Sequence, residues 1–161
     1  LLTSAERARD LRRPPVLVLG AGEAHHHRNI SQMPDLVRTA AAESGARAYE
    51  RAGVKPSDVD AVEVYDAFTI CTILFLEDLG FCAKGEGGAF VAGGRIAPGG
   101  ELPVNTNGGG LSYCHPGMYG IFVLAEAVRR IRGGDDVVVA HGNGAVLSAQ
   151  STVVLGSAAT A

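Results

Sequence analysis

The chain has 161 residues, of which 47% are hydrophobic and 19% are charged, a balance typical of one compact domain with an apolar core. Its formal net charge of -3 argues against a nucleic-acid binder, because that class of protein depends on basic patches. No apolar run reaches the roughly 18 residues of a membrane span, and the first residues lack the apolar region of a signal peptide.

The first half of the chain predicts two strands and two helices. An apolar run before Gly20 predicts a short buried strand, and a loop follows. Asp35 is placed to cap a helix that Gly53 ends. Alternating residues predict a strand, and helical spacing predicts a second helix. The expected ranges are residues 16–19 (strand), 21–33 (loop), 35–52 (helix), 59–64 (strand) and 69–79 (helix).

The second half begins with a long, glycine-rich segment over residues 80–110, which we expect to be a functional loop because of its length and its apolar residues. An amphipathic helix is predicted to follow, with arginines near its C-terminal end. A buried strand, a tight turn and a last strand complete the chain. Their expected ranges are residues 117–132 (helix), 136–140 (strand), 141–144 (turn) and 145–155 (strand).

This alternation predicts an α/β fold in which helices pack on a mixed sheet. Ligands of open α/β sheets bind beyond the carboxyl ends of strands. Tyr65 and His141 each follow a predicted strand, and Tyr113 and His115 precede a predicted helix. We therefore expect these three points of the chain to converge on one site.

The candidate site centres on the glycine run 108–110 and on Tyr113-Cys114-His115-Pro116. Glycine allows close backbone approach to a ligand, and a helix N-terminus favours an anion. His115 is suited to donate to an oxyanion or to act as a base, and Tyr113 to donate or relay a proton. Cys114 is a weaker candidate nucleophile. The alternative is a small packed cysteine and a histidine bonded to its own loop.

Other motifs leave their alternatives open. Tyr65 either donates and accepts protons or packs at a strand end with its hydroxyl bonded to backbone. His141 and Asn143 either add a proton donor and an amide to the site or form a β-turn. The histidines at 25–27 favour a solvated or subunit-contact loop over a metal site, since consecutive histidines rarely bind one ion. Three cysteines without metal-type spacing indicate reduced thiols and a cytoplasmic protein.

Taken together, these motifs resemble the C-terminal half of the thiolase superfamily, in which a His- or Asn-Glu-Ala-Phe tetrapeptide precedes a Gly-Gly…Gly-His-Pro element and a late Cys-x-Gly turn. The matching segments are Tyr65-Asp66-Ala67-Phe68, residues 109–116 and His141-Gly142. Tyr65 replaces the His or Asn that holds the oxyanion-hole water, Cys114 replaces a glycine, and His141 replaces the acid/base cysteine.

These replacements are similar to those of the lipid-transfer-protein branch, related to sterol carrier protein X thiolases and including bacterial steroid side-chain-cleaving aldolases. The resemblance implies retro-aldol cleavage of a β-hydroxyacyl-CoA to a ketosteroid and a short acyl-CoA. It assigns Tyr65 and Tyr113 to proton transfer, without deciding which serves which step, and His115 to the thioester oxygen. Gly109, Gly110, His141 and Asn143 are assigned to substrate binding.

The resemblance also implies no metal and no tightly bound cofactor, with coenzyme A entering as part of the substrate. It implies a homodimer and a partner of the DUF35 type with an OB fold. We expect the chain, residues 1–161, to be a C-terminal thiolase-like domain without its N-terminal half. The alternatives are a thiolase or acyl-CoA acetyltransferase, which would use Cys114 or Cys82 as its second thiol, and a non-catalytic acyl-CoA- or lipid-binding subunit.

Overall fold

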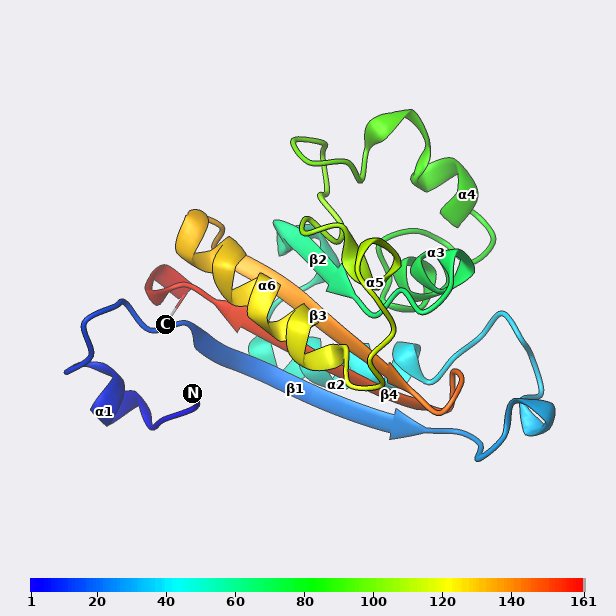
Figure 1. Ribbon diagram of the computed structural model, residues 1–161, viewed down its shortest axis with the longest axis horizontal. Coiled ribbons are helices and arrows are strands. Elements are labelled where there is room, and N and C mark those ends of the chain that lie inside the picture. The colour runs from blue at the N-terminus through cyan, green and yellow to red at the C-terminus, as the bar shows by residue number, and fades with distance from the viewer. Residues whose placement is uncertain (161) are drawn as a thin grey trace.

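A mixed sheet of four strands, in the order β1-β4-β3-β2, forms the centre of the computed structural model, which describes residues 1–160 (Figure 1). β4 pairs antiparallel with both β1 and β3, and β3 pairs parallel with β2. The strands are β1 (Leu17–His25), β2 (Ala61–Val64), β3 (Val137–Gly144) and β4 (Ala149–Gly156).

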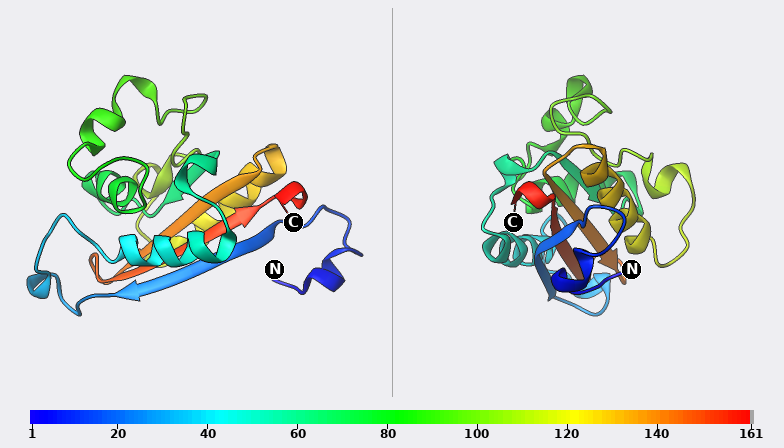
Figure 2. Two further views of the ribbon diagram at one scale, coloured as in Figure 1. Left: turned by 180° about the vertical axis from the view of Figure 1, so that it is seen from behind. Right: turned by 90° about the vertical axis from the view of Figure 1, so that its left-hand side faces the viewer.

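Helices cover both faces of this sheet. Figure 2 shows α2 and α6 on opposite sides of it. Among residues 1–160, no helix combines the length and apolarity needed to cross a membrane. The helices are α1 (Ala5–Ala8), α2 (Ala41–Ala52), α3 (Thr69–Asp78), α4 (Gly87–Phe90), α5 (Gly109–Ser112) and α6 (Gly120–Gly133), and 3-10 turns cover Ile30–Gln32, Pro56–Asp58, Ala92–Gly94 and Ala158–Thr160.

The alternation of side chains along the strands creates two apolar cores. Val62 and Val64 belong to the core shared with α2 and α3, whereas Ala61 and Tyr65 belong to the core under α6. Tyr65 therefore faces α6 from the end of β2. The expected α/β fold with a mixed sheet and the expected order of elements are confirmed.

The predicted helix from Asp35 is wrong at its beginning, because α2 begins at Ala41. The Asp35 carboxylate accepts a hydrogen bond from the Val37 amide instead, and this forms a local turn. Thr39 accepts from the Ala41 amide and donates to Asp78 of α3, so a tertiary contact fixes the helix start. The predicted stop is confirmed, since Gly53 ends α2 with φ of 68°.

The expected turn over residues 141–144 is also wrong, because these residues continue β3 and pair with β4. The chain reverses one step later, where Ala145, Val146 and Leu147 all have positive φ. The Asn143 side chain accepts a hydrogen bond from the Leu147 amide at 3.1 Å and holds this strained turn. Asn143 thus serves the turn from inside the strand.

The remaining differences concern boundaries. β1 continues through residues expected to be loop and ends at His25. β2 begins at Ala61, since the 3-10 turn before it closes on Val59. The segment 80–110 contains helical turns, and α6 begins at Gly120, after Gly117 with φ of 79°. Tertiary contacts and single backbone angles set these limits, and residue patterns do not encode them.

Candidate active site

The glycine-rich loop lies along the free edge of β2. Val104 forms an isolated parallel bridge with Val62, and the Asn105 amide donates to the Val62 carbonyl at 3.0 Å. The Asn105 side chain in turn accepts from the Val64 amide at 2.7 Å. The loop thus bonds the Val62 carbonyl and the Val64 amide on this edge, which brings the loop's next residues to the end of β2.

Asp66 anchors the glycines themselves. Its carboxylate accepts hydrogen bonds from the Gly110 amide at 2.6 Å and the Leu111 amide at 3.4 Å. Gly109 has φ of 68°, and a Cβ at this position would lie 2.1 Å from the Asp66 carboxylate. The Gly109 amide donates to Asn107 at 2.8 Å. Both glycine amides are thus bonded within the protein, and the glycines contribute close packing.

Tyr65 and His115 are the pair that the loop brings together. The Tyr65 hydroxyl lies 2.7 Å from His115 Nδ1, and the rings stand with centroids 5.5 Å apart. The Tyr65 ring also packs on Tyr119, with centroids 5.4 Å apart, and only 5% of the residue is exposed. Burial, and then the charge of Asp66, raise the pKa of Tyr65. The phenol is therefore held in its protonated form.

Tyr113 and Cys114 lie outside this pair. Tyr113 is 67% exposed, and Cys114 is an exposed free thiol. Both follow α5 and precede the first turn of α6. Within residues 1–160, no hydrogen bond joins the Tyr113 hydroxyl to Tyr65 or His115. The structure thus brings Tyr65 and His115 together and leaves Tyr113 at the surface.

His141 lies on the other face of the sheet. Its imidazole is fully buried, with Nδ1 2.9 Å from the Thr152 hydroxyl and Nε2 2.8 Å from the Gln150 carbonyl oxygen. Because the Gln150 amide group donates to Asn143, its oxygen must accept from Nε2–H. Burial lowers the pKa of His141 to about 4, so the imidazole is neutral. His141 meets Tyr65 only through its carbonyl, which accepts from the Tyr65 amide.

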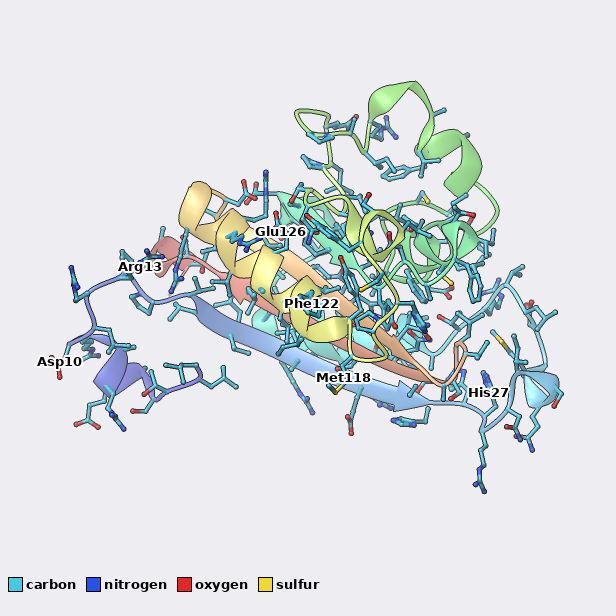
Figure 3. The ribbon with its side chains drawn as sticks, in the orientation of Figure 1. Asp10, Arg13, His27, Met118, Phe122 and Glu126 are labelled. Carbon is cyan, nitrogen blue, oxygen red and sulfur yellow. The ribbon has the colours of Figure 1, made fainter. Side chains whose placement is uncertain are left out.

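An open cavity of about 390 Å³ adjoins Tyr65. One wall comes from the segment before α6 and its first turn, where Met118 stands exposed beside β1 (Figure 3). The other wall comes from the ends of β3 and β4, including Asn143. Glu23 and His25 of β1 line the far end. The cavity thus reaches Tyr65 from a space between α6 and the sheet.

The histidines at 25–27 do not gather a metal site. His26 pairs with the Glu43 carboxylate at 2.6 Å, and this contact lowers the pKa of Glu43. Residues 1–160 contain no group of three or more histidine, cysteine or acidic side chains placed to hold a metal ion.

Residues 22–157 match the family model of the thiolase C-terminal domain-like proteins. The chain belongs to this family. The resemblance found in the motifs is confirmed, and so is the thiolase-type fold.

Three relatives with different names are similar to the chain. A steroid side-chain-cleaving aldolase of Thermomonospora curvata is 41% identical over 145 residues. A 17-hydroxy-3-oxo-4-pregnene-20-carboxyl-CoA lyase of Mycobacterium tuberculosis is 39% identical over 145 residues. An acetyl-CoA acetyltransferase of Methanothermobacter thermautotrophicus is 39% identical over 135 residues. Each match covers 83% of this chain and 35% of the relative, so the chain spans about a third of these relatives' length.

The fold is also similar to a solved structure, an Ltp2-ChsH2(DUF35) aldolase. The TM-score is 0.82 and the sequence identity 38%, over 95% of this chain and 42% of that one.

Asp66 and Gln150 are site residues that sequence reasoning missed. Asp66 is the only acidic residue of the tetrapeptide 65–68, which is the one signal that the sequence offers for it. Its role as acceptor for the glycine amides depends on a loop 44 residues later in the chain. Gln150 was hidden in a predicted strand, and only the hairpin register places it against His141 and Asn143.

Proposed function

We propose that this chain forms the reacting half of an aldolase that cleaves the side chain of a steroid β-hydroxyacyl-CoA. The observation that carries the proposal is the 2.7 Å contact between the Tyr65 hydroxyl and His115 Nδ1, beside an open cavity. Two relatives near 40% identity bear the names of a steroid side-chain-cleaving aldolase and a CoA lyase. The products are a ketosteroid and a short acyl-CoA.

The pair supplies a relay for the first proton. The Tyr65 oxygen accepts the proton of the substrate's β-hydroxyl while its own proton passes to His115 Nδ1. The Cα–Cβ bond then breaks, and the pair of electrons moves onto the thioester as an enolate. The resulting imidazolium donates from Nε2 to the enolate oxygen, where fixed donors are most effective.

Burial favours this relay over a permanent phenolate. Since the pKa of Tyr65 is raised, the phenol is protonated at rest and donates to His115. The Tyr65 oxygen accepts the substrate proton at the same time as the phenol donates its own proton to His115, so the positive charge forms on the imidazole. In this proposal Tyr65 takes the base step, a choice that the sequence alone left open.

Tyr113 then serves as the acid. Exposed and two residues before His115, it is free to protonate the enolate carbon once substrate covers the loop. The imidazolium and solvent return the proton to Tyr113, so the number of protons balances over the cycle. Neither step uses a nucleophilic thiol.

The substrate-binding residues take different parts. Gly109 and Gly110 serve binding indirectly, because their amides are bonded to Asn107 and Asp66 and their lack of side chains lets the loop pack closely against Asp66. Asn143 lines the cavity wall. His141 acts indirectly. Its imidazole is hydrogen-bonded to the Gln150 side chain, which in turn donates to Asn143 and so orients it.

We also propose that an N-terminal half and a partner complete the enzyme. Apolar side chains lie exposed around the site, among them Leu111, Met118, Ile121 and Phe122. A surface of this kind fits burial against a further domain. The name of the structural neighbour supports a DUF35-type partner. A homodimer, a cytoplasmic location in keeping with the free thiols, and the absence of a tightly bound cofactor belong to the same proposal.

A thiolase or acyltransferase is the second candidate, and the similarity to an acetyl-CoA acetyltransferase supports it. It requires a second thiol, for which Cys114 is the exposed candidate. A product assay by mass spectrometry separates the two. An aldolase releases a ketone and a shortened acyl-CoA without free CoA. A thiolase consumes free CoA. Binding of acyl-CoA without any cleavage, with and without an OB-fold partner, would favour a non-catalytic subunit.

A further inference from the structure

Two buried carboxyl groups and one hydroxyl group meet behind the site. Glu63 of β2 lies 2.8 Å from the Thr106 hydroxyl. Glu126 of α6, labelled in Figure 3, lies 2.9 Å from the same hydroxyl. The Thr106 amide also donates to Glu63 at 3.3 Å. Thr106 is thus the point where the glycine loop is tied to both β2 and α6.

The hydrogen count of this cluster requires an extra proton. A threonine hydroxyl carries one hydrogen and can donate to only one carboxylate. If both carboxylates were ionised, the second short contact would join two oxygens without a hydrogen between them. A proton on one carboxyl group removes this conflict, since that group donates to the Thr106 oxygen while the hydroxyl donates to the other carboxylate.

The surroundings place this proton on Glu63. It is 1% exposed and pairs across the sheet with Ala140 of β3, which is apolar. Burial raises the pKa of Glu63 to about 7, and the charge of Glu126 adds to the effect. Glu126 keeps a charged partner, because its second oxygen accepts from Arg129 at 3.1 Å.

The other charged groups near Glu63 do not cancel this effect. Arg130 of α6 lowers the pKa of Glu63, but its guanidinium is bonded to Asp135 at 2.6 and 2.9 Å. Tyr119, which directly precedes α6, is a further titratable neighbour, and burial raises its own pKa. Thr106 contributes only its amide and hydroxyl, and His141 of β3 lies on the opposite face.

We propose that Glu63 and Glu126 share one proton through Thr106, and that this bridge positions the glycine loop beside Tyr65 and His115. Glu63 is a positioning residue in this scheme, because it acts through Thr106. When the shared proton leaves, the hydroxyl satisfies only one carboxylate, and the tie between loop and α6 weakens. Thr106 lies three residues before Gly109, so the change reaches the segment that Asp66 anchors.

The test is a carboxyl-carbon NMR titration of the whole chain labelled with ¹³C-glutamate, together with the amide signals of Gly109 and Gly110. We expect Glu63 to titrate near neutral pH and both glycine signals to follow the same midpoint. Glu126→Gln supplies a neutral donor to Thr106, so the Glu63 midpoint should fall by at least about one pH unit. Glu63→Gln should abolish the neutral midpoint in the glycine signals.

Matched variants separate positioning from folding. Thr106→Ser keeps the hydroxyl and should keep the neutral midpoint in Glu63 and in the glycine signals. Thr106→Val removes a donor that lowers the pKa of Glu63, so Glu63 should titrate at higher pH and the glycine signals should no longer follow it. Glu77→Gln changes another glutamate with a largely covered side chain, which forms an ion pair with Lys84, and should leave the Glu63 midpoint unchanged. An ordinary acidic midpoint for both Glu63 and Glu126, or glycine signals that ignore the Glu63 titration, would overturn the proposal. These readouts require no turnover, so they stand apart from the proposed reaction.

Discussion

The Tyr65 hydroxyl and His115 Nδ1 lie 2.7 Å apart although 50 residues separate them in the sequence. The contact depends on a loop that follows the edge of β2 and on a carboxylate, Asp66, that immobilises its glycines. We expect Nδ1 to accept from the phenol, which places the histidine proton on Nε2, where the substrate's thioester oxygen is proposed to bind.

The first prediction concerns the tautomer of His115. In Tyr65→Phe the hydrogen bond to Nδ1 is lost, and ¹⁵N NMR should show both ring nitrogens moving toward a mixture of tautomers. Tyr49→Phe is the matched control, since the buried Tyr49 hydroxyl has no hydrogen-bond partner among the described residues. That variant should leave the His115 signals in place. Unchanged signals in Tyr65→Phe would mean that the contact does not exist in solution.

A second prediction concerns Asp66. Replacement by alanine leaves the Gly110 and Leu111 amides without their acceptor, so unfolding by urea should show a loss of about 1–3 kcal/mol. Asp35→Ala removes a comparable but exposed cap on the Val37 amide and should cost less than about 1 kcal/mol. Equal losses for the two variants would argue against a special role for Asp66.

Gly109 gives a third prediction. An alanine here meets the Asp66 carboxylate at 2.1 Å and must also adopt a positive φ. Gly117 has a similar φ of 79°, but nothing lies within 4 Å of a Cβ added to it. Gly117→Ala should therefore show the backbone strain alone, about 1 kcal/mol. Gly109→Ala should lose clearly more stability and should disturb the Asp66 contacts, both visible by thermal unfolding and amide NMR.

A fourth prediction concerns how stability depends on pH, because two buried groups act in opposite directions. The pKa of Glu63 is about 7 in the folded protein and 4.5 in the unfolded chain. Glu63 therefore contributes to the free energy of unfolding in full below pH 4.5, and this contribution is lost as pH rises through 7. Folding lowers the pKa of His141 from 6.5 to about 4. The contribution of His141 to the free energy of unfolding is therefore present in full above pH 6.5 and is lost as pH falls through 4. Each of the two contributions amounts to about 3 kcal/mol. Between pH 4.5 and 6.5 one falls while the other rises, so the stability of the wild type should change little there.

Urea unfolding of two variants at several pH values should reveal the contribution of Glu63 and that of His141 separately. Glu63→Gln leaves His141, so stability should fall steadily on acidification below pH 6.5. His141→Gln leaves Glu63, so stability should fall as pH rises from 4.5 to 7. Parallel pH curves for wild type and Glu63→Gln would show that Glu63 has an ordinary pKa in the fold.

The sequence predicts the order of elements and the family because these depend on patterns within single segments. Apolar spacing identifies α3, and the motifs around Tyr65 and His115 identify the thiolase relationship. Boundaries set by tertiary contact could not be found this way, since Thr39 bonds Asp78 to start α2 and Asn143 bonds Leu147 to shape the last turn.

The expected convergence of three points shows the same limit. Tyr65 and His115 meet, but the alternation of β3 turns the His141 side chain to the opposite face. Side chains alternate between the two faces along a strand, so a prediction that continued β3 through residue 144 would have placed His141 on the opposite face. The cluster of Glu63 and Glu126 was hidden for a related reason, because each residue looks like an ordinary charged position until the loop places Thr106 between them.

Single-turnover cleavage of a steroid β-hydroxyacyl-CoA tests the proposal that Tyr65 and His115 together break a carbon–carbon bond. The reaction is followed by mass spectrometry, without free CoA and with a DUF35-type partner present. We predict that wild type and Tyr49→Phe release ketone and shortened acyl-CoA at equal rates, and that Tyr65→Phe is slower by roughly 10²–10⁴-fold. Equal rates for Tyr65→Phe and Tyr49→Phe, or cleavage only when free CoA is added, would contradict it.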